Sequence, residues 1–70
     1  MALGKKIKTL REARRLSQNE LAHRVVVDQA IVSRLEAGVQ QNVRSDILRR
    51  FAQVLGCTTD YLVGMHDEER

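Results

Sequence analysis

The sequence predicts an all-α fold of five short helices packed as one domain. Three observations support this: 43% of the residues are hydrophobic, proline is absent, and apolar residues recur at helical spacing between clear helix start and stop signals. Seventy residues is close to the size at which a single hydrophobic core becomes marginal. We therefore expect one domain over residues 1–64, followed by a polar tail over residues 65–70.

The first predicted helix spans residues 3–15. Leu3, Ile7 and Leu10 repeat at the spacing that places side chains on one face of a helix, and this face is expected to enter the core. Basic side chains occupy much of the remaining surface of this helix: Lys5, Lys6, Lys8, Arg11, Arg14 and Arg15.

The second predicted helix spans residues 18–25 and has the best-marked start. Ser17 is a favoured N-cap residue, and Glu20, three residues later, completes a capping box. Leu16 and Leu21 have the spacing of a hydrophobic staple across the same cap. The start of this helix is thus predicted from local chemistry alone.

The third predicted helix begins at Gln29, after Asp28 as its N-cap, and ends at Gly38, which suits a left-handed C-terminal position. Only about three residues separate the second helix from this cap, so the two helices must cross at a steep angle. The sequence therefore predicts a helix-turn-helix over residues 17–36.

Two further helices complete the prediction. Residues 39–44 form the one long loop, after which Ser45 is expected to cap a fourth helix that Gly56 terminates. Thr58 is expected to cap a final short helix over residues 59–63.

Charge is distributed unevenly along the chain. Residues 1–50 contain eleven Lys or Arg and five Asp or Glu, whereas residues 51–70 contain one Arg and four acidic residues. A basic front half fits a polyanionic partner, because binding to phosphates releases counterions. Charge alone fits ordinary solvated helix faces equally well, so both interpretations stay open.

The composition argues against several other classes. The two histidines, His23 and His66, and the single Cys57 lack the spacing of metal ligands, and no Gly-rich phosphate loop or catalytic motif occurs. We therefore expect that the protein binds no metal or cofactor and is not an enzyme. No apolar run approaches the roughly 18 residues that a membrane span requires. A lone cysteine fits a reducing compartment, and the prediction is a soluble cytoplasmic protein with neither a membrane nor a small-molecule substrate as partner.

Five stretches along the chain occur together in a fixed order. They are Ile7-x-x-Leu10-Arg11-x-x-Arg14, Ser17-Gln18-x-x-Leu21-Ala22, Val27-x-Gln29, Val32-Ser33-Arg34-Leu35-Glu36-x-Gly38, and Leu48-x-x-Phe51-Ala52-x-x-Leu55-Gly56-Cys57-Thr58-x-Asp60-Tyr61-Leu62. In this order they resemble the Cro/C1-type helix-turn-helix proteins, the lambda-repressor-like or XRE family, over about residues 5–63. The resemblance implies a five-helix lambda-repressor-like DNA-binding domain whose second and third helices form the helix-turn-helix.

The resemblance implies that the third helix reaches base edges in the major groove through Gln29, Ala30, Ser33 and Arg34. A Gln amide can pair with N6 and N7 of adenine together, although Gln29 also fits an ordinary exposed helix position. Arg34 suits either guanine or a phosphate, and Ala30 offers only a methyl contact to thymine.

Phosphate contacts are implied for Gln18, Asn19 and Arg44, the first two because a helix N-terminus attracts anions. In the family, the residue at position 18 also braces the first glutamine of the third helix. Arg11 and Glu36 occupy positions that family members commonly join in a partly buried ion pair, so we expect a structural role for them.

The sequence departs from the family pattern at two positions. Val26 stands where the turn between the motif helices usually carries a glycine, so either the turn has a negative φ or the residue is strained. Ala37 stands where relatives often have an asparagine that contacts phosphate, which would leave one backbone anchor missing.

The function expected from these features is a repressor-like transcriptional regulator that binds double-stranded DNA, a pseudo-palindromic operator, as a homodimer. Tyr61, Val63 and Met65 are candidates for the dimer interface, and routine surface apolarity explains them equally well. The alternative function is a protein-interaction module of the same fold, such as a toxin-binding or bridging subunit, with little or no DNA reading.

Overall fold

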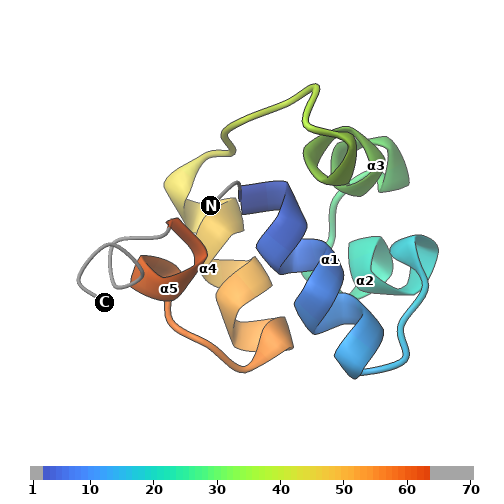
Figure 1. Cartoon of the computed structure of the whole chain (residues 1–70), viewed down its shortest axis with the longest axis horizontal. Helices are drawn as coiled ribbons and strands as arrows, with labels where there is room; N and C mark the ends of the chain where they lie inside the picture. The colour runs from blue at the N-terminus through green and yellow to red at the C-terminus, as the bar shows by residue number, and fades with distance from the viewer. Residues whose placement is uncertain (1–2, 64–70) are drawn as a thin grey trace.

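Residues 3–63 are described by a computed structural model, and this part of the chain contains five helices and no strand (Figure 1). The predicted all-α fold is therefore confirmed, while the predicted 65–70 tail and Met65 lie outside the described residues. The helices are α1 (Leu3–Ala13), α2 (Gln18–Val25), α3 (Gln29–Ala37), α4 (Ser45–Leu55) and α5 (Thr59–Val63).

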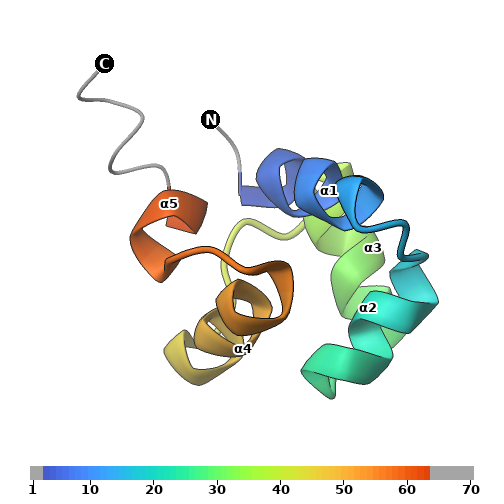
Figure 2. The same ribbon diagram turned by 90° about the horizontal axis from the view of Figure 1, so that it is seen from below.

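The five helices enclose one core to which each of them contributes. Figure 2 shows α2 and α3 at one end of the molecule and α5 at the other, with α1 lying over α3 and α4 between α5 and α2. Burial of this apolar surface is the main stabilising term for so small a domain. The largest fully buried side chains are Ile7, Leu21, Val25, Val32, Leu35, Phe51, Leu55 and Leu62.

A glycine sets the approach of α1 to α3. Gly4 is buried, and a Cβ at this position would collide with the backbone carbonyl of Leu35. The N-terminal end of α1 therefore packs directly against the backbone of α3, with no side chain between them.

The caps predicted for α2, α3 and α5 are present. Ser17 Oγ accepts from the Glu20 N–H at 3.0 Å, and the Ser17 N–H donates to Glu20 Oε1 at 2.8 Å, which completes the capping box. The hydrogen bond that the Ser17 N–H donates to the Glu20 carboxylate lowers the pKa of this carboxyl. Asp28 Oδ1 accepts from the Ala30 N–H at 3.1 Å, and Thr58 Oγ1 accepts a backbone N–H in the first turn of α5.

Two boundaries differ from the prediction. Helix α1 ends at Ala13 and not at residue 15, because Arg15 adopts a left-handed conformation with φ of 58°. The N–H of Leu16 then donates to the carbonyl of Arg11, and the N–H of Arg15 to that of Glu12, which is the hydrogen-bond pattern of a Schellman motif.

The predicted cap of α4 at Ser45 is wrong. Arg44 is the N-cap: its backbone is extended, with φ −61° and ψ 151°, and its carbonyl accepts from the Leu48 N–H at 2.9 Å. No side chain caps this helix, and Ser45 is its first helical residue. Asp46 supplies a carboxylate in the first turn, where it stabilises the helix dipole.

Val26, in the turn between α2 and α3, has a strained left-handed backbone and not the negative φ that was the other possibility. Val26 has φ of 66° and ψ of 53°, and its N–H and that of Val27 both donate to the Ala22 carbonyl. A β-branched residue in this region costs about 1–2 kcal/mol relative to an unstrained backbone. The turn is therefore left-handed at this position although it lacks the glycine that would remove the strain.

Replacement of Val26 by glycine should stabilise the fold. The side chain is 74% exposed, so few contacts are lost, while the strain is removed and only part of the gain is offset by the greater freedom of glycine in the unfolded chain. We expect Val26→Gly to raise the free energy of unfolding by about 1 kcal/mol in urea denaturation.

Val39 provides the matched control for this prediction. It is also 74% exposed but is not among the described residues with a positive φ. Val39→Gly should lower the free energy of unfolding by roughly 0.4–1 kcal/mol. Equal destabilisation by both glycines would show that the Val26 turn stores no strain.

Candidate nucleic-acid interface

The polar centre of the helix-turn-helix is an ion pair between α1 and α3. Arg11 Nε donates to Glu36 Oε2 at 2.7 Å and Arg11 Nη2 donates to Glu36 Oε1 at 3.0 Å, so the contact is bidentate. Only 11% of the Arg11 side chain and 4% of the Glu36 side chain are exposed. Arg11 Nη1 also donates to the Leu16 carbonyl at 2.8 Å. The hydrogen bond to Glu36 raises the pKa of the Arg11 guanidinium above its ordinary value.

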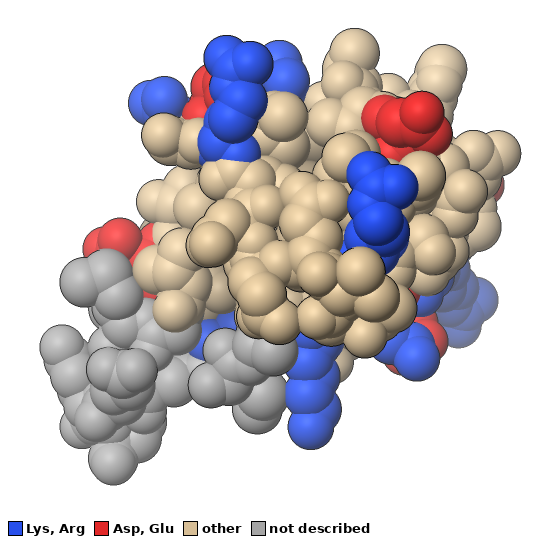
Figure 3. Space-filling view, turned by 90° about the horizontal axis from the view of Figure 1, so that it is seen from above, with Lys and Arg blue, Asp and Glu red and all other residues tan. Residues whose placement is uncertain are grey.

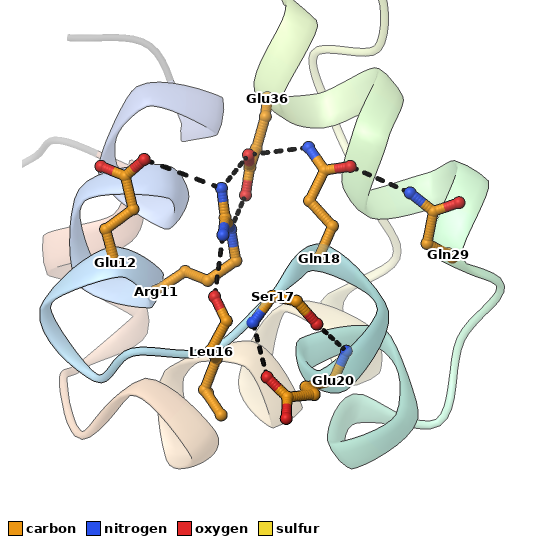
Figure 4. Close-up of polar contacts among 8 residues, drawn as sticks. All are labelled: Arg11, Glu12, Leu16, Ser17, Gln18, Glu20, Gln29 and Glu36. Atoms are coloured by element: carbon orange, nitrogen blue, oxygen red, sulfur yellow. Dashed lines mark hydrogen bonds and ion pairs between the residues drawn. The ribbon is translucent and has the colours of Figure 1, made fainter.

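Two glutamines extend this ion pair to the surface (Figure 4). Gln18 Nε2 donates to Glu36 Oε1 at 3.0 Å, and Gln29 Nε2 donates to Gln18 Oε1 at 2.9 Å. The order of these bonds follows from chemistry, because a carboxylate can only accept and the Gln18 NH₂ must therefore face Glu36. Gln29, the first residue of α3, is thereby held from α2 by a side chain that is itself anchored to the ion pair.

The remaining hydrogen-bonding capacity of Gln29 has a defined character. One N–H of its amide is used on Gln18, which leaves the carbonyl oxygen and the second N–H for an outside partner. A neighbouring acceptor and donor of this kind match N6 and N7 of adenine. Gln29 is exposed at the N-terminal end of α3, so its amide can reach such a partner.

The other residues predicted to meet bases share α3 with Gln29. Ala30 and Ser33 are half-buried, and Arg34 is exposed. Ser33 lines a shallow open hollow together with Gln18 and the Arg11–Glu36 pair, so these side chains are brought together between α1, α2 and α3. Lys8 also lines this hollow and was not predicted as a site residue, although its place in the basic cluster of the first helix was visible in the sequence.

The predicted phosphate contacts are more dispersed. Gln18 and Asn19 are the first two residues of α2, half-buried and exposed respectively. Arg44 lies beyond α3 at the start of α4, where its side chain is 82% exposed and its Nε is 3.5 Å from Asp46 Oδ1. Figure 3 shows a face with a largely uncharged centre, around which Lys and Arg side chains stand in separate places.

Two predicted interface residues lie on α5, at the far end of the molecule from α2 and α3. Tyr61 is 39% exposed and Val63 is 46% exposed. Lys6 is buried in α1, and its Nζ lies 4.8 Å from the centre of the Tyr61 ring and donates to the Tyr61 carbonyl at 2.9 Å. Part of the apolar surface of Tyr61 is thus already engaged within the chain.

The described residues contain no metal site and no membrane-spanning helix. Within residues 3–63, no three His, Cys, Asp or Glu side chains come together as a metal site requires. No helix in the same part of the chain is long and apolar enough to cross a membrane. Cys57 is half-buried against the core, and burial raises the pKa of its thiol.

Comparisons with known proteins give consistent results. The family model described as Helix-turn-helix matches residues 7–62. A solved chain from the SinR protein/SinI protein complex is similar with a TM-score of 0.85 and 26% identity; the match covers 97% of this chain and 66% of that one. SinR, the master regulator for biofilm formation, in complex with DNA is similar with a TM-score of 0.83 and 28% identity, covering 87% and 97%. A search of curated proteins finds no match.

Removal of Glu36 should be strongly destabilising. Glu36→Ala leaves the largely buried guanidinium of Arg11 without its counter-charge and Gln18 without its acceptor. We expect a loss of about 3–5 kcal/mol in the free energy of unfolding, measured by thermal or urea denaturation. Glu12→Ala is the control, because Glu12 is 59% exposed and only 4.0 Å from Arg11, and should change stability by less than about 0.5 kcal/mol. An unchanged melting temperature in Glu36→Ala would contradict a structural role for the pair.

Proposed function

Because this chain belongs to the lambda-repressor-like, or XRE, helix-turn-helix family of DNA-binding regulators, we propose that it is a sequence-specific transcriptional regulator that inserts α3 into the major groove of double-stranded DNA. The observation that carries the proposal is the braced glutamine at the start of α3. Gln29 is exposed, held by Gln18 and anchored through Gln18 to a buried ion pair. An ordinary surface glutamine has no need of such support, whereas a base-reading one gains from being held in place.

Base reading is proposed for the exposed edge of α3. Gln29 presents an acceptor and a donor to adenine. The guanidinium of Arg34 has a forked pair of N–H donors that suits O6 and N7 of guanine. Ser33 lies on the same helix beside the hollow that contains Gln18, and Ala30 contributes at most a methyl contact. These four residues would read a few base pairs.

Phosphate contacts are proposed on both sides of this edge. The first turn of α2 carries Gln18 and Asn19, where free backbone N–H groups and the helix dipole favour an anion. Arg44 would supply a third contact from the loop that follows α3, since its side chain is largely exposed. Ala37 is exposed and provides no polar group at its position, so Arg44 would carry more of the backbone contact.

A repressor-like homodimer on a pseudo-palindromic operator is the arrangement that we propose. One recognition helix reads few base pairs, and two helices set ~34 Å apart on one face of the duplex would supply the missing affinity. Val63 and the exposed part of Tyr61 would contribute to the dimer surface, together with Met65. A cytoplasmic location follows from the proposed access to DNA.

A protein-interaction module is the second candidate, because one similar chain comes from a complex of two proteins, SinR and SinI. The surface of α3 distinguishes the two functions. An interaction module would present apolar or acidic side chains there, whereas this helix presents Gln29, Ser33 and Arg34. These residues favour the DNA-reading function.

In vitro selection from random duplexes tests base reading. The wild-type chain should enrich a defined half-site, and Gln29→Ala and Arg34→Ala should each lose preference at one base position per half-site, at a cost of about 1–3 kcal/mol. Binding should also weaken by orders of magnitude between low and moderate salt, because phosphate contacts release counterions. If both variants select the wild-type motif, the base-reading assignment is wrong, and salt-insensitive or absent binding would favour the interaction module.

Sedimentation tests the proposed dimer. The free chain or its complex with the selected operator should show two copies, and Val63→Asp should shift the equilibrium toward monomer because it places a charge in an apolar contact. Val39→Asp, in the loop that follows α3, is the matched surface control for the free chain. A monomer at high micromolar concentration, with and without operator, would exclude the homodimer.

A further inference from the structure

Arg34, the proposed guanine reader, has a neighbour that the sequence did not indicate. Arg34 Nε donates to Oε1 of Gln40 at 3.4 Å, from the last turn of α3 to the loop that follows it. The loop is also tied to Arg34 through the backbone, because the N–H groups of Val39 and Gln40 both donate to the Arg34 carbonyl, at 3.0 and 3.1 Å. Side chain and backbone of Arg34 are thus held by the same short segment.

The amide of Gln40 has only one possible orientation in this arrangement. Its Nε2 donates to the carbonyl of Asn42 at 2.8 Å, and a carbonyl can only accept, so the NH₂ end must face Asn42. The oxygen end must then face Arg34, which needs an acceptor for its Nε–H. Both requirements agree, and Gln40 is fixed by its own backbone at one end and by Asn42 at the other.

We propose that Gln40 is a positioning residue for base readout, which holds the Arg34 guanidinium so that its outer edge faces DNA. The inference rests on the proposed function, in which Arg34 and Arg44 have roles, and it assigns a role to Gln40 as well. The Nε–H is used on Gln40, and the two Nη groups at the end of the fork are the pair that binds guanine O6 and N7 in a bidentate contact.

A neutral amide suits this task better than a carboxylate. An acidic residue at position 40 would hold Arg34 more tightly but would also neutralise it and repel the phosphates nearby. Gln40 supplies an acceptor without charge, so the guanidinium keeps its full positive charge for DNA. The gain comes from ordering a long, exposed side chain before binding, which reduces the entropy that the complex must lose.

The arrangement parallels the brace on Gln29 but has a different foundation. Gln18 is anchored to a buried ion pair inside the helix-turn-helix, whereas Gln40 is anchored to Asn42 in the loop. The two braces act on opposite ends of α3, one at its first residue and one in its last turn. Changes at Gln40 should therefore affect readout by Arg34 and leave readout by Gln29 intact.

The test compares Gln40→Met with Gln41→Met. Methionine keeps the length and apolar stem of Gln40, which lines a groove with Ile31 and Val43, and removes only the amide. Gln41 is the matched control, since it lies in the same loop and donates to the Gly38 carbonyl instead of contacting Arg34. Kd is measured on the selected duplex and on duplexes changed at one base pair, in the wild-type and Arg34→Ala backgrounds.

Gln40→Met should reduce discrimination about two- to tenfold at the base pair whose preference is lost in Arg34→Ala, and should not change it elsewhere. In the Arg34→Ala background it should have no further effect, and Gln41→Met should resemble the wild type in both. The melting temperature should be unchanged in both glutamine variants. Uniform loss of affinity across all duplexes, or an equal loss in the Arg34→Ala background, would show that Gln40 acts on the loop or on phosphates instead.

A measurement without DNA separates this inference from the proposed function. In the free protein, ¹⁵N relaxation of the Arg34 Nε–H should report an ordered group in the wild type and in Gln41→Met, and a mobile one in Gln40→Met. Equal mobility in all three overturns the positioning role even if the chain binds its operator. Ordered Arg34 in a chain that selects no duplex leaves the contact in place but refutes the proposed function, and with it the role of Gln40 in readout.

Discussion

The Arg11–Glu36 ion pair is the interaction on which the arrangement of the helix-turn-helix depends. It connects α1 to the C-terminal half of α3, and both oxygens of Glu36 are used, two bonds going to Arg11 and one to Gln18. Burial of two charges is costly unless their hydrogen bonds are satisfied, and here the guanidinium also donates to the Leu16 carbonyl. The pair is therefore a structural centre that also determines where Gln18, and through it Gln29, can lie.

The position of α3 is determined by backbone contacts as well as by this ion pair. Gly4 allows α1 to touch the carbonyl of Leu35, one residue before Glu36, so steric contact and ion pair act on the same turn. With α3 held there and its start capped by Asp28, the turn between the helices has little freedom. Val26 accepts a left-handed conformation under these constraints, and the strain is tolerated because caps and core outweigh about 1–2 kcal/mol.

The sequence predicted features that local chemistry determines and missed those that depend on distant contacts. The starts of α2 and α3 follow from Ser17 and Asp28, whose side chains cap the N–H groups of their own helices. The end of α1 was missed because Arg15 fills a position where glycine is the usual signal. Ser45 was mistaken for a cap because residue type alone does not show which backbone becomes extended, and Gln40 has no pattern that connects it with Arg34.

Contacts between distant residues of the chain also affect how the proposed complex would obtain its specificity. Residues 1–50 are rich in basic residues, yet Arg11 is used in a buried pair with Glu36 and is not a free charge for DNA. Net charge therefore overstates the phosphate contacts that this chain can make. Two side chains on α3, Gln29 and Arg34, are instead each held by a glutamine from outside the helix. Ordering these two side chains before binding contributes affinity that depends on the base sequence, whereas additional lysines would strengthen binding to every duplex alike.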